Sequence, residues 1–303
     1  MSVQSIRTVA FIGLGRMGRP MAANLAKAGF ALRVMDRSAE AVRDFLADHA
    51  ASAFGTPREA AAGADALITM LPAGRDVREV LLGRTPGDPE AAMKGMRPGC
   101  LVIDMSSSAP LLTRETGRQL AAGGVTMLDA PVSGGVPRAR DGTLAIMVGG
   151  DRDAIEHARP LLAALGSKIF VIGALGSGHA MKALNNYVSA AGLAAAAEAL
   201  LVGRRFGLDP AIMTEVLNAS TGRNNSTENK LKQHILSGTF GSGFSLDLMA
   251  KDLATALDLA ENLGVPTPFA ERCVPLWQDA AAHLAPGADH TEIYRFLEHL
   301  KEI

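Results

Sequence analysis

The sequence predicts an α/β protein in which an N-terminal, doubly wound parallel sheet is followed by an all-α domain, and a long helix joins the two. Two observations support this prediction. Short apolar runs alternate with helical patterns as far as about residue 175, and beyond it nearly every segment has helical periodicity. We therefore expect two domains, residues 1–175 and 176–303.

The strands of the first domain are expected in short runs rich in Val, Ile, Leu and Met. Each run is bounded by Gly, Asp or Pro, which is typical of buried strands. These runs are RTVAFIG, ALRVMD, ADALITML, CLVIDMS, VTMLDAPV and LAIMVGG. Helical patterns such as MAANLAKAG and PLLTRETGRQLAAGG lie between several of them. Repetition of strand and helix predicts a parallel sheet that is covered on both faces.

The second domain begins with MKALNNYVSAAGLAAAAEALLVGRRFG, which has no proline and is rich in alanine, so it is expected to form one long helix. Further helices are expected in GLDPAIMTEVLNAS, NKLKQHILSG, LMAKDLATALDLAENLG and TEIYRFLEHLKE, with TGRNNST as a loop. No strand pattern interrupts them, and this predicts an all-α domain.

Composition limits the classes of function. The 303 residues are 48% hydrophobic and carry a net charge of −1, which argues against a surface for nucleic acid or anionic membranes. Cys100 and Cys273 lie far apart without metal-binding spacing, so neither a disulfide framework nor a metal site is expected. The N-terminus shows no export leader, and the apolar segments appear interrupted before the roughly 20 residues that a membrane span needs. We expect a soluble, cytoplasmic protein.

A glycine motif directly after the first strand predicts a Rossmann dinucleotide-binding domain. FIGLGRMGRPMAANL places Gly13, Gly15 and Gly18 between a strand and a helix, where they permit a tight turn, approach of a pyrophosphate and close packing of helix on strand. Asp36 ends the second strand about 20 residues further on, where a carboxylate accepts hydrogen bonds from the adenosine ribose. This favours NAD. NADP stays possible because Arg37 could pair with a 2′-phosphate, and a flavin site or an empty glycine turn are the alternatives.

Other cofactor contacts are expected where later strands end, because ligands of open parallel sheets bind beyond the carboxyl ends of the strands. The alternative for Met70 and Leu71 is packing against the sheet. The expected cofactor residues before the long helix are Gly13, Leu14, Gly15, Arg16, Met17, Gly18, Asp36, Arg37, Met70, Leu71, Pro72 and Ser106.

The chain as a whole resembles the β-hydroxyacid dehydrogenase family, which includes 3-hydroxyisobutyrate dehydrogenase and tartronate semialdehyde reductase. The matching stretches are GLGRMGRPMAANLAKAG, DAPVSGGVPRARDGTLAIMVGG, GSGHAMKALNN, STGR and MAKDL, in the order of that family. The resemblance implies hydride transfer between NAD(P) and a small 3-hydroxyacid or its semialdehyde. It also implies catalysis without a metal, a substrate held in a cleft between the domains, and a homodimer or homotetramer.

The resemblance places the family's catalytic lysine and asparagine on Lys182 and Asn186. At positions i and i+4 of a helix the two side chains project from one face. A lysine can carry the hydroxyl proton and a neutral amide can hold the substrate oxygen. A solvated surface charge is the alternative for Lys182, although its neighbours Ala180, Met181, Ala183 and Leu184 suit burial.

Substrate contacts are expected at Ser133, Gly134, Gly135 and Asn225, and Lys251 is expected to contact the cofactor. Ser133, Gly134 and Gly135 offer backbone N–H groups and a hydroxyl to a carboxylate, or form a simple turn. Lys251 matches a family lysine near the nicotinamide that Asp252 could orient; the alternative is a pair of surface charges. Asn225 stands where the hydroxyisobutyrate branch has an aromatic residue, which predicts a more polar substrate, unless the loop is a solvated turn.

Two competing functions stay open at the level of the sequence. A 6-phosphogluconate-type or imine-reducing oxidoreductase shares the fold, but no helical extension or sugar-phosphate cluster is evident and Lys182 is retained. A non-catalytic nucleotide-binding module is the other competing function.

His179 and His290 show no metal-ligand spacing, and we expect surface or capping roles for both.

Overall fold

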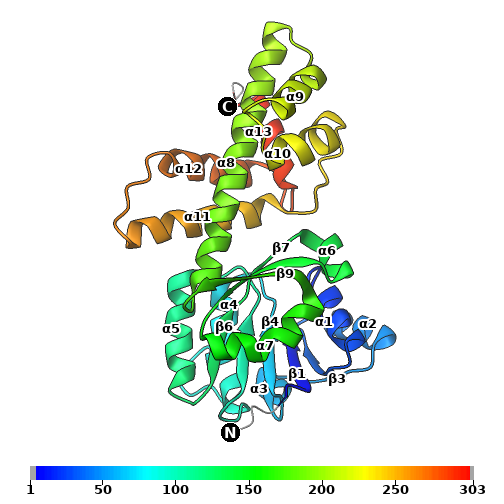
Figure 1. Ribbon diagram of the computed structural model, residues 1–303, viewed down its shortest axis with the longest axis vertical. Coiled ribbons are helices and arrows are strands. Elements are labelled where there is room, and N and C mark those ends of the chain that lie inside the picture. The colour runs from blue at the N-terminus through cyan, green and yellow to red at the C-terminus, as the bar shows by residue number, and fades with distance from the viewer. Residues whose placement is uncertain (1–4, 301–303) are drawn as a thin grey trace. The chain divides into compact units, whose positions relative to one another are not determined.

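The computed structural model describes residues 5–300. Contacts divide the chain into two compact units, Met1–Lys182 and Ala183–Ile303. The two units meet within helix α8 (Ser177–Phe206), the 30-residue helix that continues from one into the other (Figure 1). The boundary expected from the sequence, between residues 175 and 176, lies just before this helix begins.

The first unit is built on one sheet. Its strands are β1 (Thr8–Ile12), β2 (Ala31–Met35), β3 (Ser52–Ala53), β4 (Ala66–Thr69), β5 (Leu101–Asp104), β6 (Thr126–Asp129), β7 (Val132–Ser133), β8 (Leu144–Gly149) and β9 (Gly166–Gly173). They lie in the order β3-β2-β1-β4-β5-β6-β8-β7, and β9 pairs with β8. The strands from β1 to β6 pair in parallel, as the alternating pattern predicted.

The far end of the sheet departs from the expected all-parallel arrangement. β8 is antiparallel to β6 and to β7, because the chain returns through β7 and one short helix instead of a full crossover connection. β9 is not among the strands expected from the sequence. Phe170, Val171 and Ile172 of β9 are exposed, but its run KIFVIG has the same apolar composition and closing glycine as the predicted strands, so β9 was missed although the sequence carried its signal.

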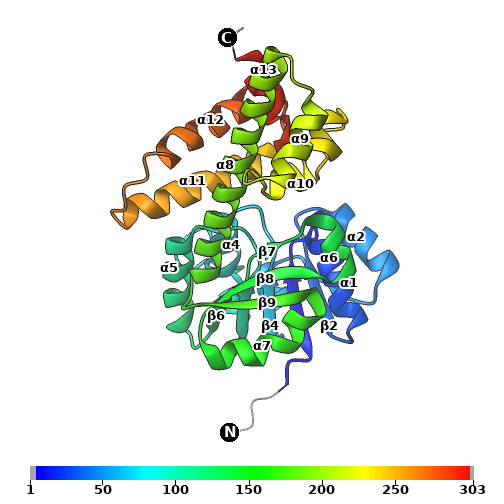
Figure 2. The ribbon, with the colours of Figure 1, turned by 45° about the horizontal axis from the view of Figure 1, so that its top comes forward.

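Helices cover both faces of the sheet (Figure 2). They are α1 (Gly18–Lys27), α2 (Ala39–Asp48), α3 (Pro57–Ala61), α4 (Gly74–Leu82), α5 (Pro110–Ala121), α6 (Gly135–Asp141) and α7 (Arg152–Leu165). Met21 of α1 and Leu161 of α7 belong to one apolar cluster. Leu81 of α4 and Leu120 of α5 belong to another. Each face of the sheet is therefore covered by its own set of helices.

The second unit is helical throughout its described residues. After α8 follow α9 (Pro210–Ala219), α10 (Asn225–Asn229), the π-helical turn η2 (Leu231–Leu236), α11 (Leu246–Asn262), α12 (Ala270–His283), the short turn η3 (His290–Glu292) and α13 (Ile293–His299). Its core surrounds Trp277, which is fully buried. Helix α12 was not expected from the sequence, because Pro275 lies inside it and removes one backbone hydrogen-bond donor.

Helix α8 is apolar enough, by length and composition alone, to cross a membrane. Its most apolar stretch has a mean hydropathy of 1.2, so the expectation that every apolar segment is interrupted was wrong for this helix. A single helix of this kind is weak evidence for a membrane span, because core helices of soluble proteins share its properties. Leu193, Ala197 and Leu200 of α8 belong to the core of the second unit, which accounts for its hydropathy.

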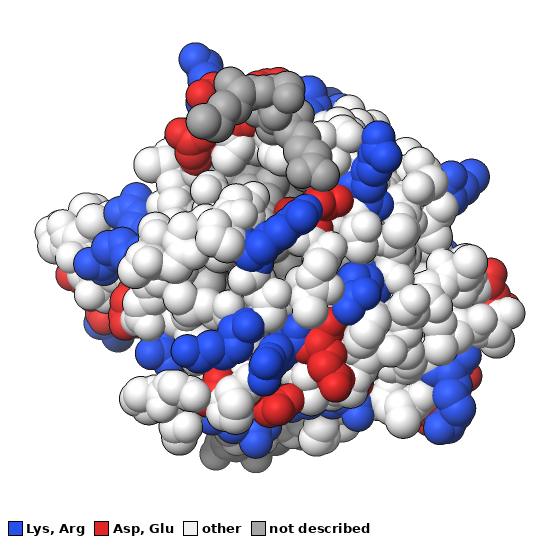
Figure 3. Space-filling model, turned by 90° about the horizontal axis from the view of Figure 1, so that it is seen from below, with Lys and Arg blue, Asp and Glu red and all other residues white. Residues whose placement is uncertain are grey.

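Charged side chains of both signs share the surface. On the face shown in Figure 3, Lys and Arg lie interspersed with Asp and Glu. Several of these charges are paired, as in the ion pairs of Arg159 with Glu156 and of Arg19 with Asp48.

Candidate active site

The glycine loop between β1 and α1 has the geometry that a dinucleotide requires. Gly13 has a φ of +104°, and a Cβ placed there would lie 2.3 Å from the carbonyl oxygen of Met70. A Cβ on Gly18 would lie 1.8 Å from the carbonyl oxygen of Gly13, whereas one on Gly15 would meet nothing within 4 Å. Only glycine fits at the first and third positions, and the second leaves space for a pyrophosphate beside the backbone.

Asp36, directly after β2, forms hydrogen bonds with the glycine loop and with the turn that leads into α2. Its Oδ2 accepts the backbone N–H of Leu14 at 2.6 Å and its Oδ1 accepts that of Ser38 at 2.8 Å. Each carboxylate oxygen keeps a further lone pair that can accept a ribose hydroxyl. Arg37 beside it is exposed. The residues present at this site therefore fit NAD. They also allow NADP, because Arg37 could pair with its 2′-phosphate.

We predict that Asp36→Ser raises the ratio of kcat/KM for NADP over NAD by about tenfold or more, because a like-charge contact with the 2′-phosphate is removed. The measurement is cofactor kinetics with one substrate. Asp44→Ser is the matched control, since Asp44 in α2 pairs with Arg19 instead. An unchanged ratio, or a wild type that already prefers NADP, would contradict the role given to Asp36.

The loop after β4 is held in place by Ser106. The Leu71 backbone N–H donates to Ser106 Oγ at 2.9 Å, and Ser106 is buried. Burial argues against a direct contact between Ser106 and a cofactor, and indicates a role in positioning the loop. Met70 and Leu71 are half-buried and pack against the apolar clusters on opposite faces of the sheet, whereas Pro72 is exposed.

Asp129, at the end of β6, anchors the start of α8. Its carboxylate accepts the backbone N–H of Gly176 and of His179, both at 2.7 Å. Two N–H groups at a helix start, which have no partner within the helix, are thereby bonded by one buried carboxylate. From the sequence, Asp129 was predicted only to lie at the end of a strand.

His179 was wrongly expected at the surface. It is buried; its Nε2 donates to the Ser106 carbonyl oxygen at 3.2 Å, and its Nδ1 forms a hydrogen bond with the Thr113 hydroxyl at 2.9 Å. The Asp104 and Asp129 carboxylates each lie 3.7 Å from a ring nitrogen. His179 therefore connects α8 to β5 and α5.

Lys182 and Asn186 lie one turn apart on α8, as the sequence predicted. Only 9% of Lys182 and 6% of Asn186 is exposed, so the alternative of a solvated surface lysine does not hold. A buried lysine within two turns of an anchored helix start has a restricted position, which a group that transfers a proton needs.

Asn186 belongs to a hydrogen-bonded chain of polar side chains. Its Nδ2 donates to Asp252 Oδ2 at 2.6 Å, and its Oδ1 accepts from Asn185 at 3.2 Å. Asp252 is buried and pairs through Oδ1 with Lys251 at 3.2 Å, so these two residues are not a pair of surface charges. The network fixes the amide of Asn186 and leaves its second N–H for a substrate oxygen.

The predicted carboxylate site lies at the junction of β7 and α6. Ser133 ends β7, and Gly134 and Gly135, with φ of +137° and +67°, begin α6 and are exposed. Asn225 begins α10 and is also exposed. Its neighbour Ser226 is buried and its Oγ donates to the Ser189 carbonyl oxygen of α8 at 3.4 Å. The flanking residues, rather than Asn225 itself, therefore make this loop's contacts with α8.

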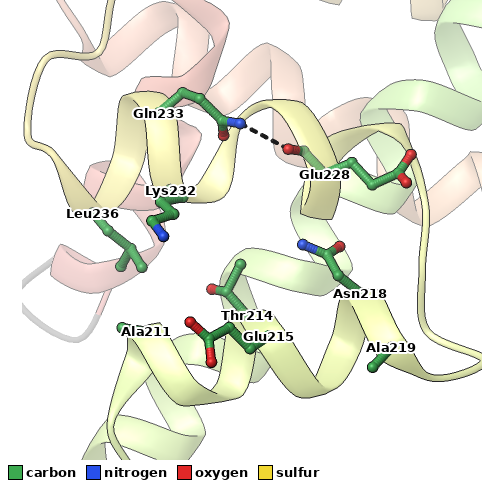
Figure 4. Close-up of a pocket in the computed structure, with 9 residues that line it drawn as sticks. All are labelled: Ala211, Thr214, Glu215, Asn218, Ala219, Glu228, Lys232, Gln233 and Leu236. Carbon is green, nitrogen blue, oxygen red and sulfur yellow. Dashed lines mark hydrogen bonds between the residues drawn. The ribbon is translucent and has the colours of Figure 1, made fainter.

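A separate pocket of about 390 Å³ lies between α9 and the α10–η2 segment (Figure 4). Glu215 and Lys232 are among its lining residues, and Gln233 donates to the Glu228 carbonyl oxygen at 2.8 Å. None of the site residues predicted from the sequence lines it. Among residues 5–300, no three His, Cys, Asp or Glu side chains gather in a group that could hold a metal ion.

Two family models together match most of the chain. Residues 8–173 match the NAD binding domain of 6-phosphogluconate dehydrogenase. Residues 176–297 match the model described as NAD-binding of NADP-dependent 3-hydroxyisobutyrate dehydrogenase.

Known proteins are similar over nearly the full length. The chain is 39% identical to the NAD-dependent L-serine dehydrogenase of Pseudomonas aeruginosa, over 90% of this chain and 92% of that protein. It is 36% identical to the 2-(hydroxymethyl)glutarate dehydrogenase of Eubacterium barkeri, over 90% and 89%. A solved structure of Mycobacterium tuberculosis 3-hydroxyisobutyrate dehydrogenase with L-serine has a TM-score of 0.87 at 35% identity, covering 96% of this chain and 99% of that one.

Proposed function

This chain belongs to the β-hydroxyacid dehydrogenase family, and we propose that it transfers a hydride between NAD(P) and the alcohol carbon of a small 3-hydroxyacid. The observation that carries the proposal is the buried Lys182, one turn from Asn186 on a helix whose start Asp129 anchors. A non-catalytic nucleotide-binding module would have no use for a buried lysine there, since burying its charge costs free energy.

The glycine loop and Asp36 bind the cofactor. Backbone N–H groups at the start of α1 meet the pyrophosphate beside Gly15, and the Asp36 carboxylate accepts a ribose hydroxyl. Bound NAD(P) supplies the hydride acceptor for oxidation, or the donor for reduction.

Lys182 and Asn186 act on the alcohol oxygen. In the oxidation direction the hydroxyl proton would pass to the Lys182 amine as the carbon–oxygen bond becomes a carbonyl, with bound NAD(P) taking up the hydride. Asn186 donates its remaining N–H to that oxygen, and Asp252 holds the amide in place. The backbone N–H groups around Gly134 and Gly135 receive the substrate carboxylate.

The names of the relatives indicate which class of 3-hydroxyacid the substrate belongs to. L-Serine, 2-(hydroxymethyl)glutarate and 3-hydroxyisobutyrate each carry a hydroxymethyl group on the carbon next to a carboxylate and differ in the third substituent of that carbon. We therefore propose a substrate of this form, oxidised to its semialdehyde. The exposed amide of Asn225 supports a polar third substituent.

The test is nicotinamide absorbance with purified protein across a panel of such acids and semialdehydes, with NAD and with NADP. We expect turnover with at least one member that has a polar third substituent. Tight NAD binding without turnover of any member would favour the non-catalytic module instead.

The family resemblance supports a homodimer or homotetramer, and the free cysteines Cys100 and Cys273 fit a reducing cytoplasm. Val202, Phe206, Ile212 and Val216 in α8 and α9 are between 58% and 83% exposed, and burial of such apolar side chains would favour an interface between subunits. The native mass from light scattering decides this point, and a monomer would contradict it.

A further inference from the structure

Lys230 is a partly buried cation without a direct counter-ion. It follows α10, and its Nζ donates to Ser189 Oγ at 3.2 Å. Within residues 5–300 the Ser189 hydroxyl is the one hydrogen-bond acceptor of Lys230 Nζ. No carboxylate oxygen of these residues lies within 4.0 Å of Nζ. An ammonium group has three N–H donors, so two of them are left for another acceptor.

The surroundings of Lys230 do not compensate its charge. Burial lowers the pKa of Lys230 to about 8, against the opposing field of Asp289. The Asp289 carboxylate already accepts hydrogen bonds from Ser242, Gly243 and Thr291. Burial first, and Lys230 second, lower the pKa of His290 to about 4, so this ring is neutral near pH 7. A desolvated charge without a direct ion pair is costly in a folded protein and marks a candidate functional position.

Lys230 lies along the face of α8 that carries the catalytic residues. Its partner Ser189 is three residues after Asn186 and seven after Lys182, so all three side chains project from one side of the helix. The rise of a helix places Ser189 about 4.5 Å beyond Asn186 along the axis. The segment is held there by the contact of Ser226 with Ser189. Lys230 is followed at once by the π-helical turn η2, a distortion that is frequent at functional sites.

We propose that Lys230, together with Ser189, binds a second carboxylate of the substrate. The substrate is then a dianionic 3-hydroxyacid whose second carboxylate lies roughly one helical turn, about 5 Å, from the alcohol oxygen. This inference rests on the proposed function and extends it, because it names the third substituent of the reacting molecule. The second carboxylate supplies the counter-ion that the chain does not provide.

The first test compares 3-hydroxyisobutyrate with analogues in which a carboxymethyl or carboxyethyl group replaces its methyl group. We expect wild type to prefer a dianion by about tenfold or more in kcat/KM. Lys230→Met should lower kcat/KM for the dianion about 10- to 100-fold and change that for 3-hydroxyisobutyrate less than about threefold, in line with one charged hydrogen bond. Lys232→Met is the matched control, since Lys232 lies two residues further on in η2 and is exposed.

The second test needs no turnover, and so separates this inference from the proposed function. Calorimetry in the presence of NAD measures the binding of 2-methylglutarate and of isobutyrate, which lack the reacting hydroxyl. Tighter binding of 2-methylglutarate that disappears in Lys230→Met supports the inference, even if no hydroxyacid is oxidised. Equal binding of the two acids, or an equal loss of both in Lys230→Met together with a lower Tm, would show that Lys230 only links its loop to α8, and would overturn it.

Discussion

Lys182→Met is expected to lower kcat/KM by about 10³-fold or more for every substrate, and to leave NAD affinity within about threefold. Methionine keeps the length and apolar stem of lysine but can neither accept the hydroxyl proton nor stabilise the alkoxide that forms as the hydride leaves. The predicted nucleotide contacts lie in the loop between β1 and α1, which this substitution does not touch.

Lys168→Met serves as the control, because it removes the charge of an exposed lysine on β9. Steady-state kinetics and NAD titration of both variants are needed. Activity of Lys182→Met within tenfold of wild type would show that another group moves the proton.

Asp129→Asn is expected to lower the free energy of unfolding by about 2–4 kcal/mol and to reduce kcat more than it raises KM. Both oxygens of the buried Asp129 carboxylate accept backbone N–H groups at the start of α8. An amide has one acceptor oxygen, so one of these N–H groups would face the –NH₂ group and lose its hydrogen bond. The start of α8 would then shift, and Lys182 with it.

The control for this prediction is Asp151→Asn. Asp151 caps α7 at the surface, accepting the Ala154 N–H at 3.0 Å, and the same change there should cost about 1 kcal/mol or less without loss of activity. Chemical denaturation and kinetics measure both variants. A stable and fully active Asp129→Asn enzyme would mean that Asp129 does not position the catalytic helix.

The parts of the fold that follow a local pattern could be predicted from the sequence. Buried strands, the glycine turn at Gly13 and the long helix α8 each have a signature within a few neighbouring residues. β9 also has one, the run KIFVIG, and was missed, whereas Pro275 interrupts the helical pattern of α12. The antiparallel direction of β8 depends on how the chain returns to the sheet, which no single segment specifies.

The residues of the candidate site likewise differ in whether a local sequence pattern predicts them. Lys182 and Asn186 are joined by helical spacing and could be paired from the sequence alone. The burial of His179 depends on Ser106, Thr113 and Asp129, residues that only the folded sheet brings to it. Lys230 lies in NKLKQHILSG, which was predicted as a helix, but nothing in that pattern indicates that this lysine packs against Ser189.

The central claim is that a hydride moves directly between the carbinol carbon of a 3-hydroxyacid and the nicotinamide ring. The most direct measurement uses a 3-hydroxyacid that the enzyme turns over, fully deuterated at its carbinol carbon, with NAD or NADP, and analyses the reduced cofactor by NMR. We expect one deuterium on the nicotinamide C4 for each semialdehyde formed, on one face of the ring. Reduced cofactor without deuterium, or semialdehyde formed without cofactor reduction, would contradict hydride transfer as the reaction of this protein.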